Sequence, residues 1–140
     1  MSKSRIIGMG DCLATLAGLK KATATAVGRR ALLPAAEILR AEVERRAPLL
    51  TGDLKASVRV IGKSQSKRRR RGAVDVTVIA DDIAAVTNEF GTSDTPIQPF
   101  FRPAIDATRE AMFDAVARDL TAETTKAAER VARRKARTGA

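Results

Sequence analysis

A single long helical pattern occupies the C-terminal part of the chain, from about Pro99 to Arg134. Apolar or small side chains recur there at steps of three and four residues, the spacing that places them on one face of an α-helix. Beyond Leu120 only Ala127 and Val131 continue the pattern, so we expect the final turns to bury little and either to fray or to meet a partner. The stripe itself consists of Phe101, Ile105, Thr108, Met112, Val116 and Leu120.

An amphipathic helix is predicted upstream, between residues 32 and 47. Apolar residues recur at three- and four-residue steps, and charged residues fill much of the opposite face. Pro34 fits if a new helix begins near Leu33, because proline is tolerated in a first helical turn; the alternative is a kink. Pro48 ends the helix, since the residue before a proline is disfavoured in the α conformation.

Two runs with period-two alternation predict an antiparallel hairpin. The first covers residues 54–60 and follows a turn at residues 51–53, and the second covers residues 74–78. The basic segment 63–72 connects the two runs, and we expect it to be a mobile loop. Asp81 and Asp82 mark the end of the second strand.

The other segments are short elements or connections. Leucines at positions 13, 16 and 19 indicate a short helix after residues 1–10, which we expect to form a flexible arm. Gly28 is either a break or a point of close packing. Residues 83–90 are ambiguous between a strand and a helical turn, and residues 91–99 form a loop. The order helix, helix, hairpin, linker and long helix predicts a single α+β domain over residues 1–140.

The composition excludes several kinds of functional site. The chain has 140 residues, of which 44% are hydrophobic and 30% charged, and no apolar run approaches the ~20 residues of a membrane span. The N-terminal residues lack a continuous apolar segment and soon include Asp11, so we expect no secretory signal. With no histidine and one cysteine, Cys12, the usual nucleophile systems, zinc sites and internal disulfides are excluded. We therefore expect no catalytic residue, no cofactor, no metal site and a reducing, cytoplasmic origin.

The net charge of +10 is concentrated in two runs, at residues 63–71 and 126–137, and the rest of the chain is nearly neutral. In the first run, the arginines either contact phosphate or belong to a solvated loop. In the second, cations near a helix C-terminus stabilise it by about 0.3–1 kcal/mol each, or they contact nucleic acid. We expect residues 126–140 to be a frayed basic tail. The candidate DNA contacts are Lys67, Arg68, Arg69, Arg70 and Arg71.

Two motifs stand at junctions between the predicted elements. The first, APLLTGDLKAS over residues 47–57, stops a helix, makes a glycine turn and starts a strand. The second is NEFGT over residues 88–92, followed by PFFRPA over residues 99–104. Gly91 permits a positive φ or a close backbone approach, and the prolines preset the start of the long helix. On physical grounds alone both motifs are joints.

The order and spacing of these motifs resemble those of the HK97-type gene-product-ten-like family. The pattern is AP…TG-x-L-x-x-S after a helix, then EFGT, then PFxRPA before a long helix, and it covers roughly residues 28–115. The segment 33–37 also suits the family, whereas Asn88 stands where an apolar residue is frequent. Members are small neck or tail-completion proteins of long-tailed double-stranded DNA phages, prophages and gene transfer agents.

The resemblance implies a structural protein of the virion neck or tail without enzymatic activity, assembled in the host cytoplasm. Such proteins form a ring, expected to be a hexamer, between the tail tube protein and the head connector or stopper protein, and we expect a tail terminator or completion role. DNA passes through the channel, and no membrane partner is implied. The basic residues from Lys67 to Arg71 are expected to contact either this DNA or a neighbouring ring. The expected subunit or partner interface comprises Thr51, Gly52, Glu89, Phe90, Gly91, Thr92, Pro99, Phe100, Arg102 and Pro103.

Two other classes stay open. A small basic nucleic-acid-binding protein would bind in a strongly salt-dependent way, although no aromatic residue is interleaved with the basic runs. An enzyme with a carboxylate site would depend on Asp81 and Asp82, but adjacent residues in a strand or turn point apart, and no third acidic ligand lies nearby. A neck protein should keep its subunit contacts in high salt.

Overall fold

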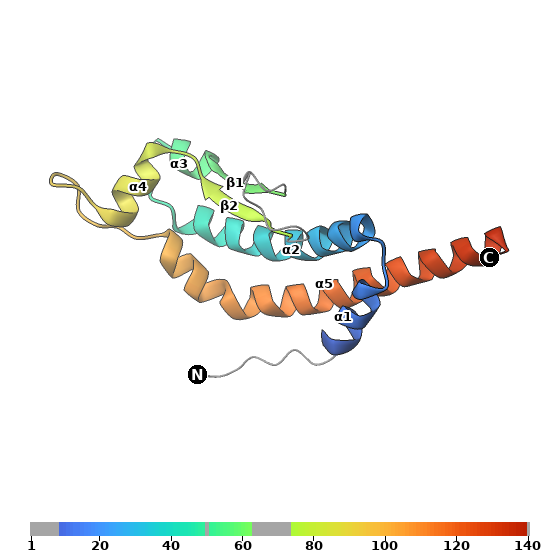
Figure 1. Cartoon of the computed structure of the whole chain (residues 1–140). Helices are drawn as coiled ribbons and strands as arrows, with labels where there is room; N and C mark the ends of the chain where they lie inside the picture. Colours follow the sequence, from blue (N-terminus) through green and yellow to red (C-terminus); the bar gives the residue numbers. More distant parts are fainter. Residues whose placement is uncertain (1–8, 50, 63–73, 140) are drawn as a thin grey trace.

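The α+β prediction is confirmed by the computed structural model, which describes residues 9–49, 51–62 and 74–139 (Figure 1). Two long helices form one layer, and a two-stranded sheet with two short helices lies against one end of it. The elements in chain order are α1 (Met9–Ala17), α2 (Lys21–Arg46), α3 (Asp53–Ala56), β1 (Val58–Ile61), β2 (Thr77–Ala80), α4 (Ile83–Phe90) and α5 (Phe101–Thr138).

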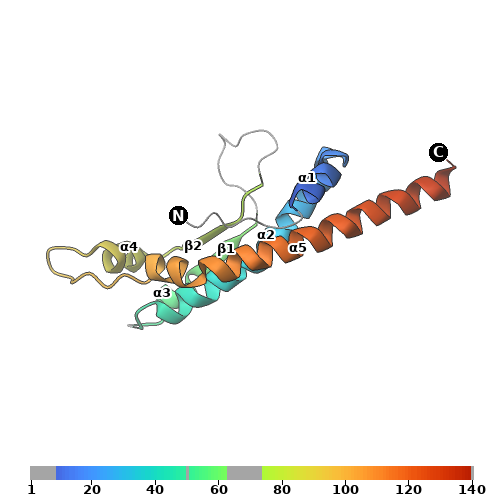
Figure 2. The same cartoon turned by 90° about the horizontal axis from the view of Figure 1, so that it is seen from below.

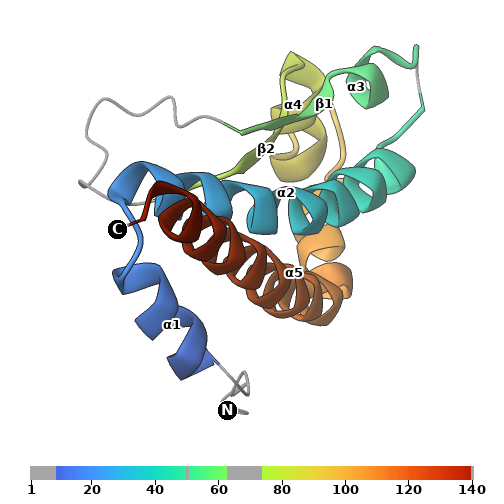
Figure 3. The same cartoon turned by 90° about the vertical axis from the view of Figure 1, so that its right-hand side faces the viewer.

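The helices α2 and α5 run antiparallel, side by side, and make the most extensive contact in the described chain (Figures 1 and 3). The buried positions of α5 are small: Ala104, Thr108, Ala115, Thr124 and Ala127. Of the predicted stripe, only Thr108 is fully buried, and the larger side chains are half-buried. Small side chains let two helix backbones approach closely, so alanine and threonine occupy the centre of the contact and the larger residues of the stripe lie at its edges.

Pro34 lies inside α2, so the prediction of a new helix beginning near Leu33 is wrong. A proline in a helix interior removes a backbone hydrogen bond and costs about 3 kcal/mol. The flanking Ala31 and Ala35 are buried, and this tertiary packing carries the helix through the proline. The helix ends at Arg46, just before Pro48, as predicted.

The two strands pair antiparallel, with Val58 opposite Ala80 and Ile61 opposite Thr77, which confirms the hairpin. Both are shorter than predicted, because residues 54–56 belong to the short helix α3 and residues 74–76 precede β2. The alternation that indicated a strand at Leu54 is therefore wrong there. Leu54 and Val58 are four residues apart, so a helical turn also places both in the core.

The buried core lies where α2, α3, β1, α4 and the start of α5 meet. The ambiguous segment 83–90 is the helix α4, which begins where the side chain of Asp82 accepts a hydrogen bond from Ala84 N at 2.7 Å. Gly28 lies within α2, and a Cβ there would come within 3.2 Å of the Val74 side chain, so close packing explains this glycine. The side chains buried in the core at this meeting point of the elements are Val43, Ala47, Leu54, Val58, Ala85, Phe100 and Ala104.

The far end of α5 extends beyond the other elements (Figure 2). Residues 129–139 are all exposed, so the last turns bury little, as expected from the sequence. Fraying of this tail stays a prediction. Most of the expected N-terminal arm, residues 1–8, and the basic loop with Lys67 to Arg71 lie outside the described residues. In the described part of the chain, no helix combines the length and apolarity needed to cross a membrane.

Candidate assembly site at the α4–α5 junction

Glu89 lies in the last turn of α4 and is only 6% exposed. Its Oε2 accepts hydrogen bonds from the backbone N–H groups of Phe100 and Phe101, both at 2.9 Å, and its Oε1 accepts one from Arg102 N–H at 3.2 Å. The first N–H groups of a helix have no partner within the helix. A carboxylate from the preceding helix therefore caps α5.

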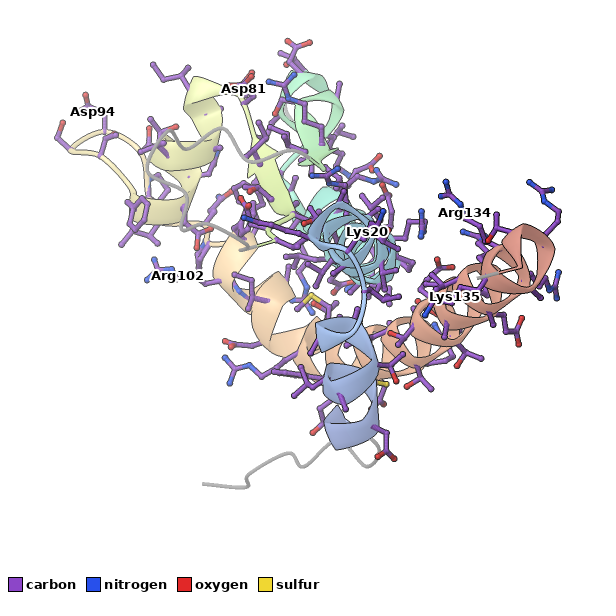
Figure 4. The ribbon with its side chains drawn as sticks, turned by 45° about the vertical axis from the view of Figure 1, so that its right-hand side comes forward. Lys20, Asp81, Asp94, Arg102, Arg134 and Lys135 are labelled. Carbon is purple, nitrogen blue, oxygen red and sulfur yellow. The ribbon has the colours of Figure 1, made fainter. Side chains whose placement is uncertain are left out.

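The side chain of Arg102, labelled at the start of α5 in Figure 4, also binds Glu89. Its Nε donates to Glu89 Oε1 at 2.9 Å, and its Nη2 donates to the backbone oxygen of Glu89 at 3.3 Å. The guanidinium carbon lies 5.1 Å from the centre of the Phe90 ring, within cation–π range. One side chain thus ties the first turn of α5 to the last turn of α4. The name "Glu89 clamp" is used below for Glu89 with these bonds to Phe100, Phe101 and Arg102.

The hydrogen bonds keep Glu89 ionised in spite of its burial. Burial on its own raises the pKa of a carboxyl group, because it disfavours the charged form. Here the Phe101 N–H, the Arg102 guanidinium, and the Phe100 and Arg102 N–H groups outweigh burial and lower the pKa of Glu89 to about 2. The positive end of the α5 dipole also favours a negative charge at this place.

Gly91 and the loop after it return the chain to the Glu89 clamp. Gly91 has φ 74°, its N–H donates to Thr87 O at 2.8 Å, and a Cβ would lie 2.7 Å from Ile97 Cγ1. Both the backbone angle and the lack of space require glycine. Within the loop, Thr92 Oγ1 accepts the Thr95 N–H at 3.0 Å. At its end, the Gln98 N–H donates to Asn88 O at 2.8 Å.

The expected interface residues divide into buried and exposed groups. Phe100 is 1% exposed and belongs to the core, so it shapes the junction and does not face a partner. Pro103 lies in the first turn of α5, where proline is tolerated. The side chains of Thr51, Phe90, Thr92, Pro99 and Arg102 are exposed.

The two sequence motifs converge in space. Thr51 lies in the turn before α3, where its hydroxyl donates to Asp53 Oδ2 at 2.7 Å and Gly52 has φ 91°. A cleft of about 250 Å³ separates this turn from α4, and Thr51, Asn88 and Gln98 line it. The Thr51–Gly52 turn and the α4–α5 junction therefore form one continuous region at the same end of the molecule.

The comparison with protein families gives a match. The model of the HK97-gp10-like family, described as "Bacteriophage HK97-gp10, putative tail-component", matches residues 11–91, more than half of the chain. The chain belongs to this family. The comparisons with curated proteins and with solved structures gave no match. Membership indicates a component of the phage tail, located in the virion tail and structural in kind.

The family match includes the Thr51–Gly52 turn and ends at Gly91. The partners of Glu89 on α5 therefore lie beyond the matched residues. Glu89 is the point at which the matched part of this HK97-gp10-like chain is joined to its long helix.

Sequence reasoning missed an apolar surface beside the Glu89 clamp. Ile83, Val86 and Phe90 follow one another at helical spacing on α4 and are 86%, 61% and 62% exposed. Ile97, 63% exposed, lies next to Gly91 in the following loop. These four residues are called the α4 ridge below. The spacing of 83, 86 and 90 is visible in the sequence, but it has a meaning only once the segment is known to be a helix.

A separate apolar groove of about 390 Å³ lies between α2, α5 and β2. It is called the α2–α5 groove below, and its lining includes Leu32, Leu39, Val78, Met112 and Phe113. The groove and the α4 ridge are different surfaces of the same chain. Large exposed apolar patches on proteins are candidates for interaction sites.

The acidic pair at the end of β2 has structural partners. Asp81 accepts a hydrogen bond from Arg59 Nη2 at 2.6 Å, and Asp82 caps α4. Cys12 is buried, with its sulfur 3.5 Å from Thr121 Oγ1. Among the described residues, no group of three or more metal-ligating side chains comes together.

Proposed function

We propose that this chain is a neck protein of a phage or phage-like particle, a tail terminator or completion protein. In this proposal it forms a ring, a hexamer, between the tail tube protein and the head connector or stopper protein. Assembly takes place in the host cytoplasm, and DNA passes through the channel. The exposed α4 ridge carries the proposal, because four large apolar side chains in contact with water are unfavourable unless a partner covers them.

A ring requires two different contact surfaces on each subunit, and this chain has two distinct apolar surfaces. Subunits in a ring meet head to tail, so one patch contacts a different patch on the neighbour. The α4 ridge projects from α4, whereas the α2–α5 groove is concave and lies on other elements. We assign the ridge to one side of the subunit contact and the groove to the other.

The Glu89 clamp has a supporting role in this proposal. It fixes α4 relative to α5 and so presents Phe90, Arg102 and the loop at Thr92 as one rigid surface. A preorganised surface loses less conformational entropy on binding. The buried residues Glu89 and Phe100 would shape the contact, and the exposed Thr51, Thr92 and Pro99 would meet the partner.

The test is the oligomeric state of the full chain in high salt, measured by light scattering and sedimentation. We expect a discrete oligomer that Val86→Glu dissociates, since a charge on the α4 ridge would be buried at the contact. Leu13→Glu is the matched control, because Leu13 is also an exposed apolar residue and belongs to α1, a helix that lies far from α4 (Figure 1). It should leave the oligomer intact.

Two results would count against the ring. One is an oligomer that both variants leave unchanged. The other is a monomer that does not join purified tail tubes and carries nucleic acid that only high salt removes. That second result would favour the alternative of a small basic nucleic-acid-binding protein.

A further inference from the structure

The exposed end of α5 carries four arginines on one face. Arg130, Arg133, Arg134 and Arg137 follow the steps of three and four residues that align side chains on a helix, and all are exposed. Figure 4 shows Arg134 on the part of α5 that extends from the body of the molecule, next to Lys135. These four side chains are called the arginine face below.

Stabilisation of the helix end does not account for the arginine face. The favourable effect of cations on a helix C-terminus is restricted to the last turn. In α5 the basic residues of the last turn are Lys135 and Arg137, so Arg130, Arg133 and Arg134 lie too far from the end.

Ion pairs within the chain do not account for it either. In the described part of the chain, Arg133 alone among the four has a carboxylate nearby, Glu129 at 3.8 Å, and that pair is exposed to solvent. The other three guanidinium groups are free to meet an anion outside the described chain.

The surroundings of the arginine face select the class of partner. Protein interfaces combine arginines with aromatic and large apolar anchors, whereas beside its basic residues the segment 129–139 offers only Val131 and two alanines. A nucleic-acid backbone can be bound by cationic side chains alone, without apolar anchors. Guanidinium groups bind its phosphates through paired hydrogen bonds. No aromatic residue follows Phe113, so the arm has no surface on which the bases of a single strand would stack.

We propose that the arginine face of α5 binds the phosphate backbone of double-stranded DNA without reading its sequence. This goes beyond the ring proposal and is independent of it, because a single subunit already carries the whole face. The helix presents its cations along one line, as contact with a row of phosphates requires.

The experiment measures binding of the full chain to a labelled duplex of mixed sequence over a series of salt concentrations. The variant replaces Arg130, Arg133, Arg134 and Arg137 with glutamine, which keeps a good helix propensity. Each lost phosphate contact lowers the slope of log K against log salt by about 0.9, so we expect the slope to fall by about 3 to 4. At low salt the affinity should fall by at least about tenfold.

A control variant removes the same net charge from scattered exposed sites. It replaces four paired arginines of the body, Arg45, Arg46, Arg59 and Arg118, with glutamine. We expect its salt slope to stay close to that of the wild-type chain. An equal loss in both variants would mean that binding follows total charge and would overturn the proposal, as would a wild-type slope in the first variant.

A competitor distinguishes phosphate from protein carboxylate. We expect unlabelled duplex to displace the labelled DNA and polyglutamate at the same charge concentration to leave it bound. Displacement by polyglutamate would overturn the proposal and would point to an acidic protein surface as the partner of the arginine face.

Discussion

The two ends of α5 use charge in opposite ways. At its start, Glu89 is buried and ionised, and every bond of the Glu89 clamp is satisfied within the chain. At its far end, the arginine face is exposed, and its cations have little to pair with in the described chain. A buried charge needs its partners because desolvation is costly, and so it fixes geometry. An exposed charge costs little in the folded chain, and so it is available for binding.

The largest effect should come from removing the Glu89 carboxylate. Glu89→Ala leaves three backbone N–H groups and the Nε of Arg102 without their acceptor. We expect the free energy of unfolding in urea to fall by about 3 kcal/mol, because buried N–H groups lose their acceptor, whereas the exposed Arg102 side chain is hydrated by water. The control Glu110→Ala, at an exposed position of α5, should change it by less than about 0.5 kcal/mol. Equal losses in both variants would remove the contrast between the two ends.

Acid should remove the stabilisation that the ionised Glu89 carboxylate gives to the start of α5. Glu89 has a pKa of about 2 in the folded chain against an ordinary 4.5, so its stabilisation is fully present above about pH 5 and is lost as the pH falls towards 2. A difference of about 2.5 units corresponds to about 3 kcal/mol. We expect the unfolding free energy of the wild-type chain to fall through this range more steeply than that of Glu89→Gln. Parallel pH profiles for the two proteins would contradict this role of the carboxylate.

Replacing the two positive-φ glycines of the motifs with alanine should lower the free energy of unfolding by different amounts. Gly91→Ala combines an unfavourable φ with a Cβ 2.7 Å from Ile97, whereas a Cβ at Gly52 meets nothing within 4 Å. We expect Gly91→Ala to lower the unfolding free energy by about 1–3 kcal/mol and Gly52→Ala by about 1 kcal/mol. Urea titration of both variants measures the difference. A larger loss of unfolding free energy for Gly52→Ala would show that the loop at Ile97 moves away from a Cβ at position 91 at little cost.

The smallest effect on stability is expected at the far end of α5. The glutamine variant of the arginine face should unfold within about 0.5 kcal/mol of the wild-type chain, because exposed substitutions without partners rarely matter more. Urea titration at moderate salt checks this. A loss above about 2 kcal/mol would show that these arginines hold the fold together, and the comparison between the two ends would then fail.

Local signals account for what the sequence predicted correctly. The periodicity of α5, the stop before Pro48 and the alternation in the two strands depend on neighbouring residues, and the structure has all three features. Pro34 and Leu54 were misassigned because tertiary packing outweighs a proline, and because a four-residue spacing fits a helix as well as a strand.

The sequence predicts where the candidate site lies but not the hydrogen bonds that hold it together. The second motif contains Glu89, Gly91 and Phe100. The hydrogen bond that the Phe100 N–H donates to the Glu89 carboxylate, eleven residues earlier, cannot be deduced from this spacing. The α4 ridge was missed for a related reason. The sequence of a short apolar segment does not show which of its faces is exposed, because that depends on how neighbouring elements pack. Here Ala85 is buried in the core, whereas Ile83 and Val86 are exposed.

The continuity of α5 has a geometric consequence. Its 38 residues span about 57 Å, and its buried positions run from Ala104 to Ala127. The turns after Ala127 therefore project about 16 Å past the last buried side chain, clear of the other elements (Figure 2). The α4 ridge and the arginine face thus lie at opposite ends of one continuous helix, so a protein on the ridge and a duplex on the arginine face do not compete for space.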